Sequence, residues 1–224
     1  MAQLFSVADL SAGKEAAALR AMNEYNFEQL LPFEYIVSSE PTKGLKFESP
    51  SDPFLRLSRP KVSGFEVFYS GPTKKWALRT TQWKSIGEDA VLFEYAGELS
   101  EDRDEPVEQD DYIFTFDYQK RHFLLDACRR GNLARFVNHS CVPNCFTRLA
   151  LVDNNNNDGG GGDRGGDNVP RLFICASRRI LAGEEITLDY GDAWWRAKWT
   201  TNAGICCHCK WEKCRYKNAN LKWN

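Results

Sequence analysis

Long apolar runs and a secretion signal are both missing from this chain of 224 residues. No stretch approaches the roughly 20 consecutive apolar residues that a membrane-spanning helix needs. The first residues, Met1 to Ser6, carry no charged segment followed by an apolar core, so they lack the pattern of a secretory leader. We therefore expect a soluble intracellular protein that enters no membrane.

An excess of basic charge is missing as well. Lys and Arg number 29 against 31 Asp and Glu, which gives a formal net charge of −2. This balance argues against a protein that binds nucleic acid through a broad basic face, and we expect no direct sequence-specific nucleic-acid binding. A basic peptide is the better partner. No basic cluster that would serve as a nuclear import signal is present.

Cysteine, in contrast, is plentiful, with eight residues. Because no secretion signal precedes them, metal ligands and reduced core thiols are a better interpretation than disulfides. Cys207 and Cys209 are followed after four residues by Cys214, and a structural zinc ion needs a fourth ligand from elsewhere, for which Cys141 is the candidate. Cys206 competes with Cys207, but only Cys207 keeps both spacings. The predicted core thiols are Cys128, Cys145 and Cys175.

Hydrophobic residues make up 42% of the chain, with seven Trp and fourteen Phe, which is enough for one folded domain with appendages. Short β-rich segments bounded by Gly, Pro or charge predict small sheets of mixed exposure and exclude an all-helical fold. These segments are Phe65 to Tyr69, Trp76 to Thr80, Ala90 to Tyr95, Tyr112 to Phe116, Phe123 to Asp126, Phe146 to Val152 and Arg171 to Ala176.

Two segments have a composition that opposes burial. Residues 153–169 are rich in Asn, Gly and Asp, which predicts a flexible hairpin insertion with no catalytic role, because such a sequence cannot offset its ordering entropy. Residues 101–111 are strongly acidic. They are either a solvated loop or a segment that steers a basic peptide toward the site.

Three motifs follow one another in the second half of the chain: Arg-Phe-Val-Asn-His-Ser-Cys-Val-Pro-Asn at 135–144, Gly-Glu-Glu-Ile-Thr-Leu-Asp-Tyr-Gly at 183–191, and the terminal Cys-x-Cys-x4-Cys. Together, and in this order, they resemble a SET-domain protein lysine methyltransferase. Residues 86–99 resemble the strand-turn-strand opening of the same domain. A joint match of this kind is highly specific, whereas an isolated Cys-x-Cys indicates little.

The resemblance implies a mostly β (α+β) fold, with a SET domain of small sheets, a pseudoknot-like crossing of two segments, and a zinc-binding post-SET tail. We expect an N-terminal wrap without a zinc cluster over residues 1–64, the SET domain over 65–192, and the post-SET segment over 193–224. The resemblance covers almost the whole chain and is weakest over 37–66.

Within the family, Asp9-Leu10-Ser11, Asn23 and residues 32–36 resemble the region before the SET domain in suppressor-of-variegation-type histone H3 lysine-9 methyltransferases, where this stretch is extended. Local propensity favours a helix instead, because Lys14 to Met22 is the best helix-forming run in the chain. We favour the extended conformation. The triple-zinc cluster of that subfamily cannot form, since residues 37–66 contain no cysteine, so packing must stabilise this part.

By resemblance, the chain transfers a methyl group from S-adenosylmethionine to a histone lysine, with histone H3 lysine 9 as the expected target and a nuclear, chromosomal location. Zn²⁺ is the expected structural ion, and a histone tail in chromatin is the expected partner. Two alternatives stay open: a catalytically silent SET module that binds a chromatin partner, and a methyltransferase for a non-histone protein.

The resemblance also assigns roles to individual residues. Tyr190 corresponds to the catalytic tyrosine, and Tyr112 to a tyrosine that lines the lysine channel and contacts the cofactor. Asn138 and His139 are expected to hold the cofactor, partly through backbone groups, with Asn138 also fixing the crossing of two segments. The remaining expected cofactor contacts are Lys75, Trp76, Ala77, Arg135 and Trp195. Trp194 and Trp195 either close over the site or pack in the core.

Two positions depart from the family pattern. The family's Gly-Trp-Gly-x-Arg turn is Lys75-Trp76-Ala77-Leu78-Arg79 here, so the first glycine is lost and a methyl group is added where close approach to the cofactor is expected. This change favours the silent-module alternative. Leu188 replaces the Phe or Tyr that stands two residues before Tyr190 in the family. Its smaller side chain implies room for a higher methylation state.

Overall fold

The computed structural model describes residues 5–6, 9–15, 20–23, 33–50, 54–101, 111–152, 168–201 and 204–217. This part of the chain is mostly β, as expected, with one short 3-10 helix and one α-helix among the described residues. The strands are β1 (Phe5–Ser6), β2 (Arg20–Asn23), β3 (Glu34–Tyr35), β4 (Glu40–Pro41), β5 (Arg56–Leu57), β6 (Phe65–Gly71), β7 (Lys75–Thr80), β8 (Val91–Glu94), β9 (Glu98–Glu101), β10 (Ile113–Tyr118), β11 (Arg121–Asp126), β12 (Arg130–Gly131), β13 (Asn138–His139), β14 (Cys145–Val152), β15 (Arg171–Ala176) and β16 (Thr187–Leu188). The helices are η2 (Leu133–Phe136) and α1 (Gly191–Thr201).

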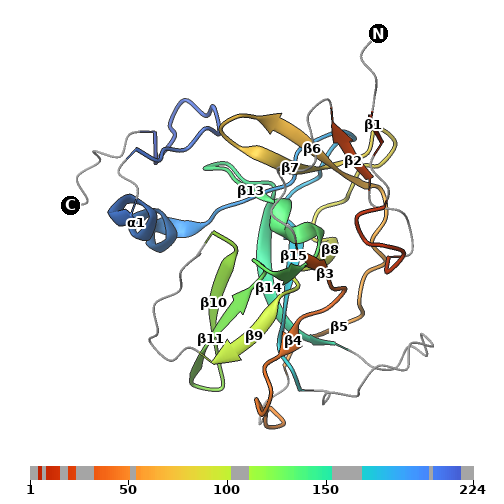
Figure 1. Ribbon diagram of the computed structural model, residues 1–224, viewed down its shortest axis with the longest axis vertical. Coiled ribbons are helices and arrows are strands. Elements are labelled where there is room, and N and C mark those ends of the chain that lie inside the picture. Colours follow the sequence, from red (N-terminus) through yellow and green to blue (C-terminus); the bar gives the residue numbers. More distant parts are fainter. Residues whose placement is uncertain are drawn as a thin grey trace.

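The strands form several small sheets, not one large one (Figure 1). The four-stranded sheets have the orders β1-β2-β6-β7, β10-β11-β9-β4 and β5-β14-β15-β8, and two-stranded pairs join β12 to β3 and β13 to β16. The expected β segments from residue 65 to 176 are therefore confirmed. Among the described residues no helix has the length and apolar character that crossing a membrane requires.

The core lies where these sheets pack against one another. Phe93 of β8, Phe123 of β11 and Leu99 of β9 are completely buried, as is Leu133 at the start of η2. These side chains belong to one continuous hydrophobic cluster, which also includes Val67 of β6. Since residues from three sheets and from η2 share this cluster, the segment that carries the Arg-Phe-Val-Asn-His-Ser motif is anchored directly in the core.

The N-terminal wrap is only partly extended where the structure describes it, because residues 10–13 form turns in which the Ala12 N–H donates to the Asp9 carbonyl at 3.1 Å. Residues Arg20–Asn23 form β2, which pairs in parallel with β6, and β3 pairs in parallel with β12. Tertiary pairing thus overrides the helical propensity of the Lys14 to Met22 run at its C-terminal end. Residues 16–19 of that run, and residues 24–32, lie outside the described part.

A buried carboxylate helps to hold the wrap in place of the missing metal cluster. Glu94 of β8 is 2% exposed and accepts hydrogen bonds from the backbone N–H of Ser39 (2.8 Å) and from Ser38 Oγ (3.1 Å). Arg59 and Arg171 each place a guanidinium nitrogen 3.6 Å from it. Because a buried charge requires partners, this network ties residues 38, 39 and 59 to the central sheet.

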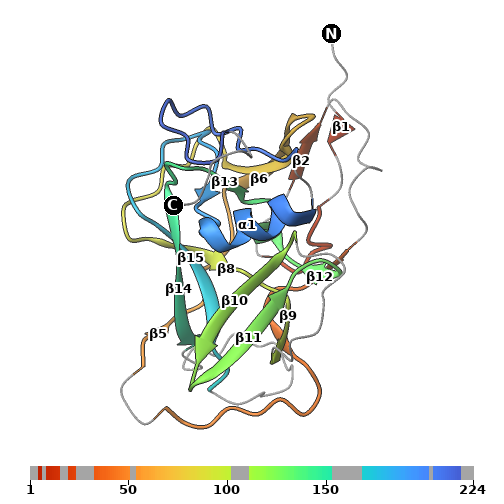
Figure 2. The same cartoon turned by 90° about the vertical axis from the view of Figure 1, so that its left-hand side faces the viewer.

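The two segments of biased composition fall largely outside the described residues, which omit 102–110 and 153–167. On either side of the second gap, β14 and β15 form a regular antiparallel pair from Cys145↔Ala176 to Ala150↔Arg171. Figure 2 shows this pair running beside the β10–β11 hairpin, with α1 near the end of that hairpin.

Candidate active site and metal centre

Two segments that are far apart in sequence cross at the centre of the site. Strands β13 and β16 run in parallel, with Asn138 opposite Thr187 and His139 opposite Leu188. The N–H of Ser140 donates to the carbonyl of Leu188 at 2.8 Å and extends the pairing. This is the crossing that the motifs at 135–144 and 183–191 implied.

The side chain of Asn138 links this crossing to the β6–β7 sheet. Its Nδ2 donates to the backbone carbonyl of Trp76 at 3.1 Å and lies 3.4 Å from Glu185 Oε1. The same Glu185 oxygen is 2.9 Å from Lys74 Nζ. Asn138 of β13 therefore joins two other segments: β7 through the Trp76 carbonyl, and the residues before β16 through Glu185, which also pairs with Lys74.

Asn144, to which the sequence assigned no role of its own, also fastens the crossing. It is 1% exposed, and its Nδ2 donates to the carbonyl of Glu185 (2.8 Å) and to Glu184 Oε1 (3.0 Å). Its Oδ1 accepts from the N–H of Thr187 at 2.9 Å. The sequence does offer a signal for Asn144: it is a polar amide that lies between Pro143 and the predicted strand, inside the motif at 135–144.

Tyr190 lies directly after the crossing. Its hydroxyl donates to the carbonyl of Val137 at 2.7 Å, and its N–H donates to His139 Nδ1 at 3.1 Å. Burial is the main cause that raises the pKa of the phenol, and neighbouring Tyr112 adds to it. Tyr95 is buried beside it and donates its hydroxyl to the carbonyl of Tyr112 at 2.9 Å. The Tyr190 phenol is thus fixed and uncharged at neutral pH.

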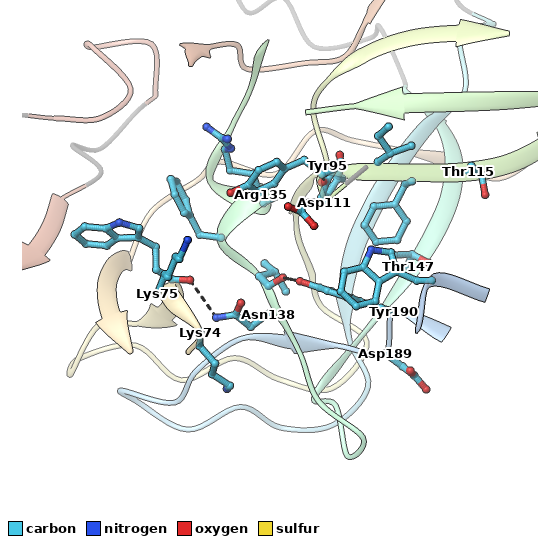
Figure 3. Close-up of a pocket in the computed structure, with 18 of the residues that line it drawn as sticks. Lys74, Lys75, Tyr95, Asp111, Thr115, Arg135, Asn138, Thr147, Asp189 and Tyr190 are labelled. Carbon is cyan, nitrogen blue, oxygen red and sulfur yellow. Dashed lines mark hydrogen bonds between the residues drawn. The ribbon is translucent and has the colours of Figure 1, made fainter. Parts of the chain in front are cut away.

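A cavity of about 780 Å³ adjoins these tyrosines (Figure 3). Of the residues expected at the site, Lys75, Trp76, Tyr112, Arg135, Asn138 and Tyr190 line it. Lining residues that the sequence did not single out include Lys74, Tyr95, Asp111, Phe114, Val137, Thr147, Asp189 and Ala193. In Figure 3, Lys74, Lys75 and Asn138 lie on one side of the cavity and Tyr190 and Thr147 on the other.

The other expected cofactor contacts do not line this cavity. Ala77 is completely buried within β7, and Trp195 is 3% exposed and stacks on Tyr216 with ring centroids 4.8 Å apart. Its neighbour Trp194 lines the cavity instead and packs 4.8 Å from the Tyr190 ring. The assignment of Ala77, His139 and Trp195 as cofactor contacts therefore stays a prediction.

His139 connects the cavity wall to the C-terminal tail. Its ring packs edge-on against Tyr190 (5.4 Å), Trp195 (5.1 Å) and Tyr216 (5.3 Å), and its Nε2 lies 3.4 Å from Cys141 Sγ. Burial lowers the pKa of the imidazole to about 4. The ring is therefore neutral and accepts the hydrogen bond from the Tyr190 backbone.

The four predicted metal ligands come together. The sulfur atoms of Cys141, Cys207, Cys209 and Cys214 lie within 4.8 Å of one another. Cys141 Sγ is 3.9 Å from Cys207 Sγ and 3.7 Å from Cys214 Sγ. A tetrahedron with Zn–S bonds of about 2.3 Å has edges of about 3.8 Å, so these sulfurs fit a zinc ion.

Ion pairs fasten α1 and the tail around the cavity. Lys198 of α1 is 7% exposed, and its Nζ lies 2.6 Å from Asp111 Oδ1, next to Tyr112. Arg215 pairs with Asp189, the residue before Tyr190. Each pair joins the C-terminal part of the chain to a residue that lines the cavity.

The arrangement suits a ligand that carries both charged or polar groups and an apolar part, because the lining combines lysine and amide side chains with tyrosine and tryptophan rings. In Figure 3, Lys74, Lys75 and Asn138 lie apart from Tyr190. The volume is in the range of roughly 300–1,000 Å³ that is usual for small-molecule sites. Asp111 and Asp189 are the acidic residues among those that line the cavity, and no cysteine is among them.

Comparisons with known proteins agree with this geometry. Residues 75–191 match the SET domain. The histone-lysine N-methyltransferase SUV39H2 of Xenopus tropicalis is 34% identical over 131 residues, which is 55% of this chain and 29% of that protein. The chain thus spans less than a third of the length of this relative.

Two solved structures share the fold. Arabidopsis thaliana SUVH6 in complex with SAM superimposes with a TM-score of 0.69 at 21% identity, covering 93% of this chain and 55% of that one. KRYPTONITE in complex with mCHH DNA, an H3(1–15) peptide and SAH gives 0.66 at 22% identity, covering 93% and 52%. Since the SET match alone spans more than half of the sequence, and the crossing, the tyrosine pocket and the cysteine cluster lie around it, the chain belongs to the SET-domain family.

Proposed function

We propose that this chain is an S-adenosylmethionine-dependent protein-lysine methyltransferase whose substrate is a histone tail, with histone H3 lysine 9 as the target. The observation that supports it most strongly is the cavity that Tyr95, Tyr112 and Tyr190 line together with Lys75 and Asn138. The similar protein SUV39H2 is named a histone-lysine N-methyltransferase, and KRYPTONITE was solved with an H3 peptide and SAH. Both names support the proposal.

The bound cofactor supplies an electrophilic methyl group, and the residues of the chain align the lysine with it in line and exclude water. The uncharged Tyr190 hydroxyl, held by the Val137 carbonyl, directs its oxygen toward the reacting groups. A lysine has an ordinary pKa of about 10.4 and attacks only when neutral. The rings of Tyr95, Tyr112 and Trp194 line the cavity, and a substrate lysine that enters between them loses water, which lowers its pKa by desolvation.

Zn²⁺ is proposed as a structural ion held by Cys141, Cys207, Cys209 and Cys214. The ion joins the tail to the loop that follows β13, and the Cys207 N–H already donates to the Tyr216 carbonyl at 2.8 Å. Because Tyr216 and Trp195 pack on His139, and His139 accepts from Tyr190, order in the tail supports the catalytic tyrosine.

A histone substrate places the protein in the nucleus on chromatin. The proposed division is an N-terminal wrap over 1–64, a SET domain over 65–192 and a zinc-binding tail over 193–224. Leu188 is 2% exposed and does not line the cavity, so the higher methylation state stays a prediction.

The test is methyl transfer from labelled S-adenosylmethionine to histone H3 with zinc present. Tyr190→Phe is expected to lower kcat at least about a hundredfold, because the positioned hydroxyl is lost, and to leave cofactor affinity within about threefold. Tyr118→Phe is the matched control, since the Tyr118 hydroxyl is buried without a hydrogen-bond partner among the described residues and does not line the cavity.

Each result has a distinct meaning. Transfer to H3 that vanishes when the target lysine of the peptide is replaced by alanine supports the full proposal. Cofactor binding in calorimetry without transfer to H3 contradicts the histone substrate and points to a non-histone protein. Absence of both transfer and cofactor binding overturns the enzyme and leaves a silent SET module.

A further inference from the structure

Arg135 carries a buried positive charge that hydrogen bonds satisfy only in part. It lies in η2, is 6% exposed, and borders the cavity. Its Nη2 donates to the Cys128 carbonyl at 3.3 Å, but Nε and Nη1 have no hydrogen-bond partner among the described residues. Burial lowers the pKa of the guanidinium, which nevertheless stays charged at neutral pH, as arginine does in proteins.

Aromatic rings compensate this charge. The Arg135 Cζ lies 4.0 Å from the ring centroid of Phe33 and 4.3 Å from that of Tyr112, with the Phe136 ring further away at 5.7 Å. A cation over a ring face is stabilised by the ring quadrupole, more strongly when water is excluded. Phe33, Arg135 and Tyr112 therefore form a cation–π stack.

The backbone explains why Phe33 reaches Arg135. Phe33 precedes β3, whose parallel pairing with β12 places Glu34 opposite Arg130. The Glu34 N–H donates to the Arg129 carbonyl at 2.8 Å, and the Ile36 N–H donates to the Gly131 carbonyl at 2.9 Å. Because η2 begins two residues after β12, this register fixes the distance between the wrap and Arg135. Phe33 itself does not line the cavity.

The stack bears on two tyrosines of the site. Tyr112 lines the cavity, and its carbonyl accepts the hydroxyl hydrogen bond of Tyr95 at 2.9 Å. Tyr112 therefore joins the stack through its ring and contacts Tyr95 through its backbone. The wrap, which lies before the residues matched to the SET domain, thus has a physical route into the lysine channel.

We propose that Phe33 is a positioning residue that acts through the Arg135 guanidinium to set the orientation of Tyr112 in the lysine channel. This inference rests on the proposed methyl transfer. It gives the cysteine-free wrap a part in catalysis that goes beyond stability. Phe33 does not line the cavity, so its effect on the reaction passes through the stack.

The decisive experiment replaces Phe33 in the full chain with 4-fluoro-, 3,5-difluoro- and pentafluorophenylalanine. Fluorine withdraws electron density from the ring face while it leaves ring shape and apolar character nearly unchanged, so it weakens cation–π attraction without creating a cavity. We expect kcat to fall in step with fluorination, by about tenfold at the pentafluoro ring. KM for S-adenosylmethionine should stay close to wild type, and the unfolding midpoint should fall modestly but remain above the assay temperature. Phe33→Tyr, which keeps an electron-rich ring face, should retain the wild-type kcat.

A second readout does not need activity. The Nε–H resonance of Arg135 in a ¹⁵N-labelled chain is shifted by the currents of both rings, and it should move progressively through the fluorinated series. A resonance that stays in place overturns the stack. Unchanged kcat in a series whose resonance does move overturns the positioning role. Failure of the wild type to transfer methyl groups refutes the proposed function instead, and removes the positioning role with it, while the resonance still decides whether the stack exists.

Discussion

At the scale of single residues, the altered turn at 75–77 has a conformational explanation. Lys75 has a φ of 56°, in the left-handed region where glycine is unstrained and other residues are disfavoured. The glycine that the family has at this position can adopt this φ without strain, whereas Lys75 adopts it at an energetic cost. Ala77 is completely buried and does not line the cavity. Its methyl group therefore takes no space from a ligand in that cavity.

We predict that Lys75→Gly leaves the free energy of unfolding unchanged or raises it by up to about 1 kcal/mol, because relief of the left-handed strain offsets the greater flexibility of the unfolded chain. Lys75→Val should lower it by about 1–2 kcal/mol, since a β-branched side chain tolerates this φ poorly. Urea unfolding of the three proteins measures both effects. A Lys75→Gly variant less stable than Lys75→Val would contradict the explanation.

At the scale of elements, the crossing of β13 and β16 depends on Asn144. Truncating it leaves the N–H of Thr187 and the carbonyl of Glu185 without their partner, and Thr187 is only 9% exposed. Asn144→Ala should therefore lower the free energy of unfolding by about 2–4 kcal/mol. Asn168→Ala, which removes an exposed hydrogen bond to Ser49, should change it by less than about 0.5 kcal/mol. Equal effects in denaturant unfolding would contradict the role of Asn144.

The tail offers a second element-scale prediction through two adjacent cysteines. Cys207 lies in the sulfur cluster, whereas Cys206 is half-buried outside it, with its sulfur 3.4 Å from His208 Nε2. Cys207→Ser should lose bound zinc, become sensitive to proteolysis beyond α1 and lose methyl transfer, because metal binding and local folding are coupled. Cys206→Ser should retain all three properties. Metal analysis after chelator dialysis measures the difference, and the reverse pattern would refute the ligand assignment.

At the scale of the whole molecule, buried groups with raised pKa values predict weakening at high pH. Burial raises the pKa of the Cys145 thiol to about 12, and it also raises the pKa values of the Tyr95 and Tyr190 phenols. Above pH 9 to 10 the unfolded chain releases these protons while the folded chain keeps them, so stability is complete below this range and falls as pH rises toward 12.

Each such group should remove about 1.4 kcal/mol per pH unit within this window. Urea unfolding at pH 7.5, 9 and 10.5 measures the slope, and Cys145→Ala serves as the comparison because it removes one titrating group. The free energy of unfolding of the Cys145→Ala variant should fall less steeply with pH than that of the wild type. Parallel slopes would show that the Cys145 thiol titrates alike in both states.

Much of this molecule follows from local sequence. Alternating and apolar runs predicted the strands from Phe65 to Ala176, because side-chain periodicity is a local property. The cysteine spacing predicted three of the four clustered sulfurs, and the need of a structural zinc ion for a fourth ligand pointed to Cys141. The crossing was predicted from the resemblance of the motifs at 135–144 and 183–191 to the SET family, and the catalytic role of Tyr190 stays a prediction.

Tertiary structure decided the rest. Arg20–Asn23 is a strand although the sequence run from Lys14 to Met22 has high helix propensity, because pairing with β6 outweighs that propensity. Tyr95, Thr147 and Phe114 line the cavity because strands from separate sheets converge there, and no local pattern encodes which face of a strand meets another sheet. Three features depend on partners that are far apart in sequence: the hydrogen bonds of Asn144, the network around Glu94, and the stack of Phe33, Arg135 and Tyr112. Such contacts arise only when packing brings the segments together, and the energetics of burial then select their partners.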